Sequence, residues 1–176
     1  CVPCNNNEGA DLHWYYFDPV TGAAHYGWTW VKSAHKGVFY DEVNAWMMYG
    51  WLEYQGKRYH LDEVDGHLES IFSNSIVVDR FVNWALGIAA DDSHGYDQQY
   101  RWNERGDYDC SSLVVSALRQ AGLDTGGATY TGNMVSNLTA RGFQWITDFS
   151  QLQYGDILLN QVQHTAIYLG NNLLVH

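Results

Sequence analysis

The sequence predicts an α+β fold in two modules, a row of β-hairpins followed by a domain in which helices pack on an antiparallel sheet. Three patterns predict this order. Short aromatic runs that end in aspartate repeat through residues 11–70. Apolar residues then recur at three- and four-residue steps in two stretches, which is typical of amphipathic helices. Apolar and β-branched runs broken by Gly and Asn fill residues 155–176, as in consecutive antiparallel strands.

Residues 1–10 are polar, and we expect them to form a tail before the first module. Cys1 and Cys4 (CVPC) can bridge each other, carry a lipid on Cys1, or remain unpaired in this tail. The polar stretch that follows them favours the unpaired state. Three cysteines cannot all pair within one chain, so Cys110 is predicted to be a free thiol.

Residues 11–70 repeat a unit of 21 to 23 residues. Asp18, Asp41 and Asp62 each end a strand-like aromatic run (WYYFD, GVFYD and RYHLD), and a turn follows each of them. Five of the eight Trp lie within the first 51 residues, which separates this module from the rest by composition. Units of this size cannot fold alone, so we predict hairpins stacked in a row around a shared aromatic core.

The second module, residues 71–176, begins with helical periodicity. The stretch 76–88 has one apolar face and predicts a helix that ends before Asp91. The polar stretch 91–109 is too rich in Gly and charge for a regular element, so we expect a loop that lines a site. A second apolar stripe over 113–121 predicts another helix.

Cys110 is predicted to lie in the first turn of that second helix, because Asp109 is a good N-cap and Gly122 is a good stop. The amide dipoles at a helix start favour negative charge, and therefore the nucleophilic thiolate. A cysteine that serves as a small buried hydrophobe is the alternative. This segment alone does not separate the two interpretations.

The strand-like runs at the end of the chain predict that His164 and His176 lie close together. In the run HTAIYL, His164, Ala166 and Tyr168 share one face. A three-residue loop at 170–172 would pair Ala166 with His176, which makes the two histidines diagonal neighbours about 7 to 8 Å apart. A loop shortened by one residue would turn His176 to the opposite face.

Composition excludes two classes of partner. The formal net charge is −11 and both modules are acidic, so a nucleic-acid partner is not expected. The sequence also has no apolar run near the roughly 20 residues that a membrane helix needs.

The repeats of the first module resemble the cell-wall-binding repeats of choline-binding and glucan-binding proteins. In that family, aromatic cages hold a quaternary ammonium by cation–π attraction. The resemblance implies wall-ligand binding by four aromatic side chains, Trp14, Tyr16, Trp28 and Trp51. Gly37 and Arg58 stand where the next two units would match Trp14, so at most one complete choline cage is expected. Aromatic side chains that only build a small β core are the alternative.

The segments DCSSL, LQYGDI and HTAIYLGNNLLVH resemble, in this order, the NlpC/P60 family of peptidoglycan peptidases and the related phage-lysin amidases. The two serines after the cysteine favour the lysin branch. The resemblance implies a papain-like fold, with Cys110 as the nucleophile, His164 as the general base and then acid, and His176 as the group that orients His164. It implies no cofactor and no metal, although zinc at the two histidines with a carboxylate remains an alternative.

Further site residues follow from the same resemblance. Asp109 and Ser111 flank the nucleophile where relatives contact the substrate's amine or peptide, with simple helix capping as the alternative. We expect Tyr96 and Trp102, in the preceding loop, to wall the cleft. Domains of this family continue past the third triad residue, whereas the sequence stops at His176, so we expect a domain cut short.

The expected function is therefore that of a peptidoglycan hydrolase, extracellular or at the cell wall, or released from a phage-infected host. Its partners would be peptidoglycan, together with a wall polymer or choline. The scissile bond is either the amide between the muramyl group and L-Ala or the bond between γ-D-Glu and the diamino acid. The alternative is a non-catalytic wall-binding protein.

Overall fold

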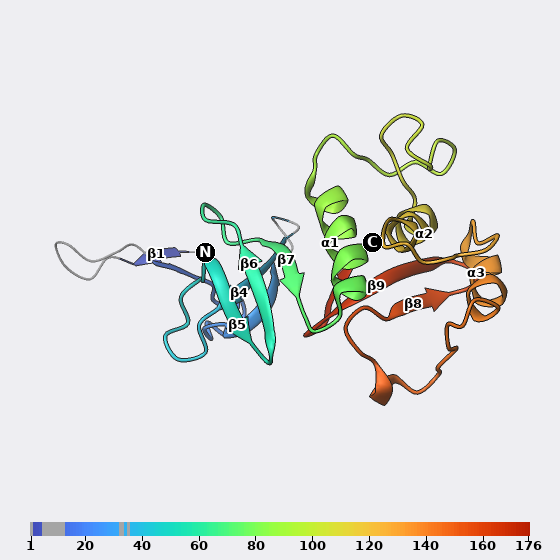
Figure 1. The fold of residues 1–176 in the computed structure, drawn as a ribbon. Coiled ribbons are helices and arrows are strands. Elements are labelled where there is room, and N and C mark those ends of the chain that lie inside the picture. The colour runs from blue at the N-terminus through green and yellow to red at the C-terminus, as the bar shows by residue number, and fades with distance from the viewer. Residues whose placement is uncertain (1, 5–12, 32–33, 35) are drawn as a thin grey trace. The chain divides into compact units, whose positions relative to one another are not determined.

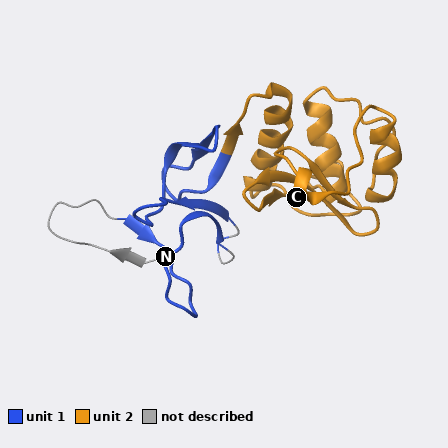
Figure 2. Cartoon of the chain, turned by 90° about the horizontal axis from the view of Figure 1, so that it is seen from below, with its two compact units in different colours: residues 1–69 blue, residues 70–176 orange. Residues whose placement is uncertain are grey.

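The computed structural model describes residues 2–4, 13–31, 34 and 36–176. The chain divides into two compact units, residues 1–69 and residues 70–176 (Figure 2). Cys1 lies outside the described residues.

The first unit is a series of antiparallel strand pairs, as the repeats predict. Its strands are β1 (Val2–Cys4), β2 (His13–Tyr15), β3 (Gly27–Val31), β4 (Lys36–Tyr40), β5 (Gly50–Tyr54) and β6 (Lys57–Leu61), and β7 (Leu68–Phe72) begins in it and ends in the second unit. Strand β1 pairs with β2, β3 with β4, and β5, β6 and β7 form one sheet in that order. Within the expected tail, residues 2–4 form β1 and pair with β2, while residues 5–10 lie outside the described part.

The repeated aspartates build one kind of turn three times. One carboxylate oxygen of Asp18, Asp41 and Asp62 accepts hydrogen bonds from the backbone N–H groups two and three residues further on, at 2.6 to 3.0 Å. Such local bonds hold a turn without help from the rest of the fold. Each turn closes on a residue with positive φ, and these are Gly22, Ala45 and Gly66.

Part of the aromatic load of the first unit lies in a small core. Val31, Val38, Tyr40 and Met47 form a buried cluster, against which Tyr16 and Tyr49 pack. Tyr16 therefore has a structural role, as the alternative interpretation of the aromatics expects.

The second unit contains α1 (Ile76–Ala90), α2 (Cys110–Gln120), α3 (Thr131–Thr139) and the short 3₁₀ helix η1 (Phe149–Gln151) (Figure 1). Helix α1 packs on α2. Both were predicted, and α1 ends just before Asp91 as expected, whereas α3 and η1 were missed. Of the helices in the described part of the chain, none has the length and apolar character that a membrane span requires.

A three-stranded antiparallel sheet completes the second unit, with β8 (Ile157–Asn160), β9 (His164–Gly170) and β10 (Leu173–Val175) in the order β10-β9-β8. Helix α2 packs on β9. The fold is thus mixed α+β, with hairpins first and then three α-helices packed with a small antiparallel sheet.

The hairpin between β9 and β10 differs from the predicted one, but it still brings His164 and His176 together. Gly170 pairs with Leu173, so the loop holds two residues, Asn171 and Asn172, whose φ values of 52° and 61° suit a tight hairpin. The predicted three-residue loop is therefore wrong. The register then shifts, because Leu174 pairs with Tyr168 and Leu169 is passed over. This one-residue bulge offsets the shorter loop and restores the parity of the two strands.

Candidate active site

Helix α2 starts at Cys110 because its first turn is capped twice. The Asp109 carboxylate accepts a 2.7 Å hydrogen bond from the Ser112 N–H, and the Ser112 hydroxyl oxygen accepts a 2.8 Å bond from the Asp109 N–H. This reciprocal pair fixes the entry of the chain into the helix. Cys110 is a free cysteine and is 6% exposed.

The Asp109 carboxylate also binds two groups besides the helix backbone. Arg101 Nη1 donates to Oδ2 at 2.6 Å, and the Ser111 hydroxyl donates to Oδ1 at 2.9 Å. Burial alone would raise the pKa of Asp109, but the hydrogen bonds from Arg101, Ser112 and Ser111 outweigh it and hold that pKa below its usual value. Asp109 is therefore an ionised and fully engaged group.

His164 and His176 meet at the edge of the sheet. His164 opens β9 and His176 follows β10, and their ring centroids lie 4.8 Å apart at an interplanar angle of 84°. Burial and the neighbouring His164 lower the pKa of His176. His176 is thus neutral at neutral pH, with one ring nitrogen able to accept a hydrogen bond.

A cavity of about 210 Å³ lies beside the start of α2. It brings together two elements that are far apart in sequence, the loop 91–109 and His176. Leu113, one helical turn after Cys110, also lines it. Of the residues predicted for the site, Tyr96, Asp109 and His176 border this cavity.

Four other residues predicted for the site are not among those that line this cavity, and these are Cys110, Ser111, Trp102 and His164. The Trp102 ring lies near two guanidinium groups, with Arg101 Cζ 5.7 Å and Arg119 Cζ 5.3 Å from the ring centroid. Trp102 and Tyr96 each form a β-bridge with Tyr108, so the main chain at these three residues helps to hold the loop that walls the cavity. Tyr96, the other residue expected to wall the cleft, does line the cavity and is 63% exposed.

Two residues of the site were not singled out in the sequence. His94 lines the cavity, and its Nδ1 bonds to the Gly106 carbonyl oxygen across the loop. Arg101 forms a 2.6 Å ion pair with Asp109 and is not itself among the residues that line the cavity. Both lie in the loop 91–109, which was expected to line a site. Their positions close to Tyr96 and Trp102 in the sequence could have marked them as candidate site residues.

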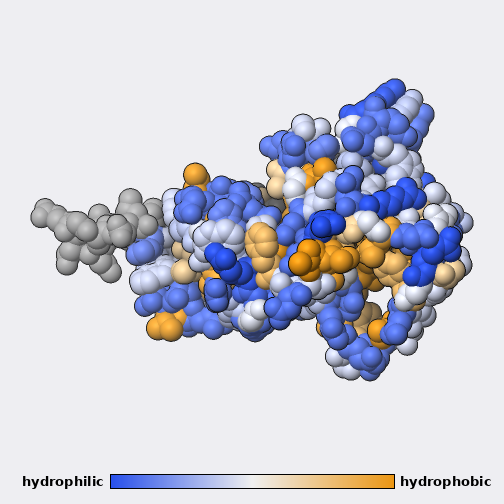
Figure 3. Space-filling model, viewed as in Figure 1, coloured by the Kyte–Doolittle hydropathy of each residue, from blue (hydrophilic) through white to orange (hydrophobic). Residues whose placement is uncertain are grey.

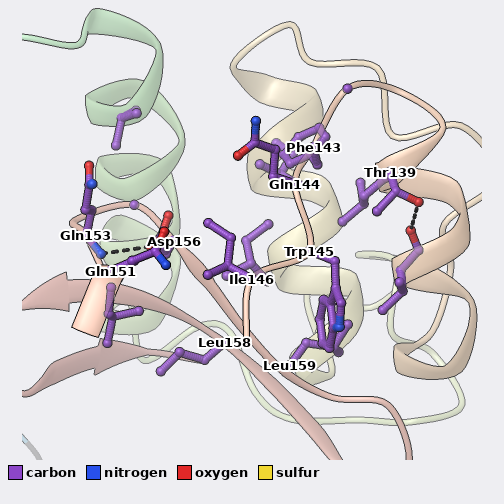
Figure 4. A pocket seen from close by; sticks show the side chains of 18 of the residues that line it. Thr139, Phe143, Gln144, Trp145, Ile146, Gln151, Gln153, Asp156, Leu158 and Leu159 are labelled. Carbon is purple, nitrogen blue, oxygen red and sulfur yellow. Dashed lines mark hydrogen bonds between the residues drawn. The ribbon is translucent and has the colours of Figure 1, made fainter. Parts of the chain in front are cut away.

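A second and larger cavity of about 630 Å³ lies elsewhere in the same unit. It is lined by the start of α1, the end of α3, the segment 141–156 and β8, and Figure 4 shows Trp145, Ile146, Leu158 and Leu159 among its side chains. Apolar side chains also gather over α1 and β8 on the face shown in Figure 3. None of the predicted site residues lines this cavity, so its size does not make it the catalytic candidate.

The four predicted wall-ligand residues lie in different surroundings. Trp14, in β2, is 39% exposed. Tyr16 contacts His25 and Tyr40, and Trp28 contacts Phe39 and Tyr59 at centroid distances of 5.3 and 4.8 Å. Trp51 is 52% exposed, and the Arg58 guanidinium lies 4.2 Å over its ring.

The contact between Arg58 and Trp51 bears on choline binding. A cation already lies over one face of this ring, so a quaternary ammonium would have to displace the guanidinium to bind there. The departure at Arg58 that the sequence shows therefore has a direct structural effect.

Among the described residues, one group of three side chains has its potential metal-ligand atoms within 4.8 Å of one another, and it consists of Asp62, Asp65 and His67. Its members already bind one another and Lys36, since His67 Nδ1 lies 2.6 Å and Lys36 Nζ 3.1 Å from Asp65. The group includes neither His164 nor His176.

Comparison with known families gives one decisive match. Residues 72–173, more than half of the chain, match the family described as the endolysin-like domain. The chain belongs to the endolysin-like domain family. The match spans the capped start of α2, the loop that walls the cavity, and His164, and this family suggests a cell-wall lytic role.

Solved structures resemble part of the chain. CbpJ from Streptococcus pneumoniae TIGR4 is 28% identical over 39% of this chain and 21% of its own, with a TM-score of 0.32. Choline binding protein F from the same species is 31% identical over 33% of this chain and 18% of its own, with a TM-score of 0.30. The chain therefore spans about a fifth of the length of these proteins. No curated protein matches it.

Proposed function

We propose that the second unit hydrolyses an amide bond of the peptidoglycan stem peptide by cysteine catalysis. In this proposal Cys110 is the nucleophile, His164 the general base and then acid, and His176 the group that orients His164. The contact between the two imidazoles carries the proposal, because His164 lies within the endolysin-like match and opens β9, the strand that packs against the helix that Cys110 begins.

The reaction would proceed by acyl transfer. His164 accepts the thiol proton, and the sulfur of Cys110 forms a bond to the amide carbon. His164 then gives this proton to the leaving nitrogen as the C–N bond breaks. Water attacks the resulting thioester, with His164 again as base, and releases the free acid and the thiol.

The surroundings suit this sequence of steps. A neutral His176 can accept a hydrogen bond from the second N–H of His164, which fixes the ring and stabilises the imidazolium as it forms. Its lowered pKa keeps this acceptor available at neutral pH. First-turn N–H groups of a helix have no acceptor within the helix, so those of Cys110 and Ser111 are suited to hold the oxyanion.

Two scissile bonds fit this chemistry, the muramyl–L-Ala amide and the bond from γ-D-Glu to the diamino acid. Digestion of purified peptidoglycan, followed by identification of the new amino termini, decides between them. New L-Ala ends would exclude the endopeptidase.

We also propose that the first unit anchors the protein to the wall. The exposed rings of Trp14 and Trp51 support this role, since stacking can bind a wall polymer that the acidic chain would not attract by charge. The protein would then act at the cell wall, outside the cell or after release from an infected host.

The experiment that tests the proposal replaces the nucleophile. Cys110→Ala should abolish digestion of peptidoglycan while binding to the wall remains, and Ser116→Ala, in the same helix, serves as the matched control. Unchanged digestion by Cys110→Ala would refute cysteine catalysis. Activity that a chelator removes and a thiol-alkylating reagent spares would favour a zinc hydrolase, and binding without digestion by the unmodified protein would favour a pure binding module.

A further inference from the structure

The cavity beside α2 has an acidic residue in its wall. Asp109 borders it directly before Cys110, and a carboxylate in such a place would ordinarily attract an ammonium group. A stem peptide released from the glycan carries one, because the amine of its first residue is free and protonated at neutral pH. In the intact wall the same nitrogen is acylated and carries no charge.

The structure assigns that carboxylate to another cation. Arg101 Nη1 lies 2.6 Å from Asp109 Oδ2, and the Arg101 and Asp109 side chains are 24% and 6% exposed. Ser111 and Ser112 bind the other oxygen at 2.9 and 2.7 Å. Each carboxylate oxygen is therefore engaged by this chain, and the negative charge is balanced before any substrate arrives.

We propose that Arg101 sets the specificity of the site, so that it accepts peptides whose first nitrogen is acylated and discriminates against peptides with a free amine. Arg101 acts through Asp109 and is thus a positioning residue. This inference rests on the proposed function, since it names the form of substrate that the site takes. It implies action on the intact wall polymer rather than on released peptides.

The discrimination against a free amine arises from the balance of charge at a largely buried ion pair. To bind Asp109, a substrate ammonium would have to break the bond to Arg101 and leave a guanidinium at 24% exposure without its carboxylate. The ammonium would also lie near a like charge. A neutral amide meets neither cost, so the acylated peptide is favoured.

Binding to the Cys110→Ala protein tests this without turnover. The probes are two tetrapeptides with the sequence of the stem, one N-acetylated and one with a free amine, and the dissociation constants are measured by calorimetry. The acetylated peptide should bind more tightly. Adding Arg101→Gln should tighten binding of the free-amine peptide on the order of tenfold, which is the effect of one hydrogen-bonded charge, and change binding of the acetylated peptide by no more than about twofold.

Three further variants separate specificity from structure. Arg101→Lys keeps the cation and should keep the preference for the acetylated peptide. Arg101→Gln combined with Asp109→Asn removes both charges and should abolish the gain of the free-amine peptide that Arg101→Gln alone produces. Arg141→Gln is the matched control, because Arg141 forms a similar but exposed 2.7 Å ion pair with Asp124, and it should change neither constant.

The pH dependence provides a readout that a purely structural role would not affect. The gain of the free-amine peptide in Arg101→Gln should disappear as the pH rises through the amine pKa of about 8. His94 and His176 also line the cavity, so the ratio of the two constants in Arg101→Gln is compared at each pH with the ratio in the protein that keeps Arg101, because both proteins contain these histidines.

Several results would overturn the inference. They are an unchanged ratio in Arg101→Gln, an equal loss of both peptides in a variant that still unfolds cooperatively, and no binding of either peptide. Failure of the proposed function is seen separately, as digestion of peptidoglycan that survives Cys110→Ala.

Discussion

The ion pair at the head of α2 allows a worked prediction of stability, with Asp109→Ala as the change. Loss of an N-cap costs about 1 kcal/mol. The Arg101 guanidinium, at 24% exposure, also loses its carboxylate, and a hydrogen bond left unmade to a charged group costs about 1–2 kcal/mol at a site that water can partly reach. The free energy of unfolding of the second unit should therefore fall by about 2–3 kcal/mol.

Thermal unfolding followed by circular dichroism measures this loss. A domain of this size shifts in Tm by about 4–8 °C per kcal/mol, so a drop of roughly 8–24 °C is expected. Asp124→Ala is the matched control, because its 2.7 Å ion pair with Arg141 has side chains that are 69% and 42% exposed. It should unfold almost like the unmodified protein.

The free energy of unfolding should also depend on pH through the charge of Asp109. The pKa of Asp109 is lowered in the folded state, so its charge stabilises the fold above the unfolded value of about 3.9, and this contribution is lost as the pH falls through the folded pKa. Asp109→Asn should be less sensitive to acid in that range. Equal losses in Asp109→Ala and Asp124→Ala would refute the reasoning, since burial would then have no effect on the value of the pair.

Three further predictions follow from single contacts. His164→Gln should raise the pKa of His176, because a neighbouring charge that lowers it is removed, and a proton NMR titration that shows no change would contradict this. Gly155→Ala should destabilise the second unit by about 2–4 kcal/mol in denaturant unfolding, because Gly155 has a φ of +89° and an added Cβ would clash with a methyl group of Val78 in α1. Unchanged stability would show that the turn adapts. Arg58→Gln should free one face of Trp51 and increase quenching of Trp fluorescence by choline, and an equal response in both proteins would show that this ring is not a cation site.

The sequence predicted the parts of the site that depend on short-range rules. A helix cap involves residues only three positions apart, so the short segment 107–113 contains every residue needed to predict that Asp109 caps α2 at Cys110. Because side chains alternate between the two faces of a strand, the sequence also predicted that His164 and His176 lie on one face. The predicted loop was wrong, since a two-residue loop and a bulge at Leu169 replace the three-residue loop.

Other parts could not be predicted from local patterns. Helix α3 has nine residues, of which only Met134 and Leu138 are buried, so its apolar periodicity is too brief to stand out. The bond from Arg101 to Asp109 crosses an irregular loop, where no periodicity tells which side chains meet. The register that passes over Leu169 depends on how β10 packs, which no turn rule specifies.

The proposed catalysis depends on activation of the Cys110 thiol by His164, and the rate of alkylation measures this most directly. Iodoacetamide should modify Cys110 at neutral pH, with peptide mapping by mass spectrometry to follow this residue alone. We predict that His164→Gln slows the reaction at least about tenfold while thermal unfolding is unchanged. An equal rate in both proteins would contradict it, because the thiol would then react without the imidazole.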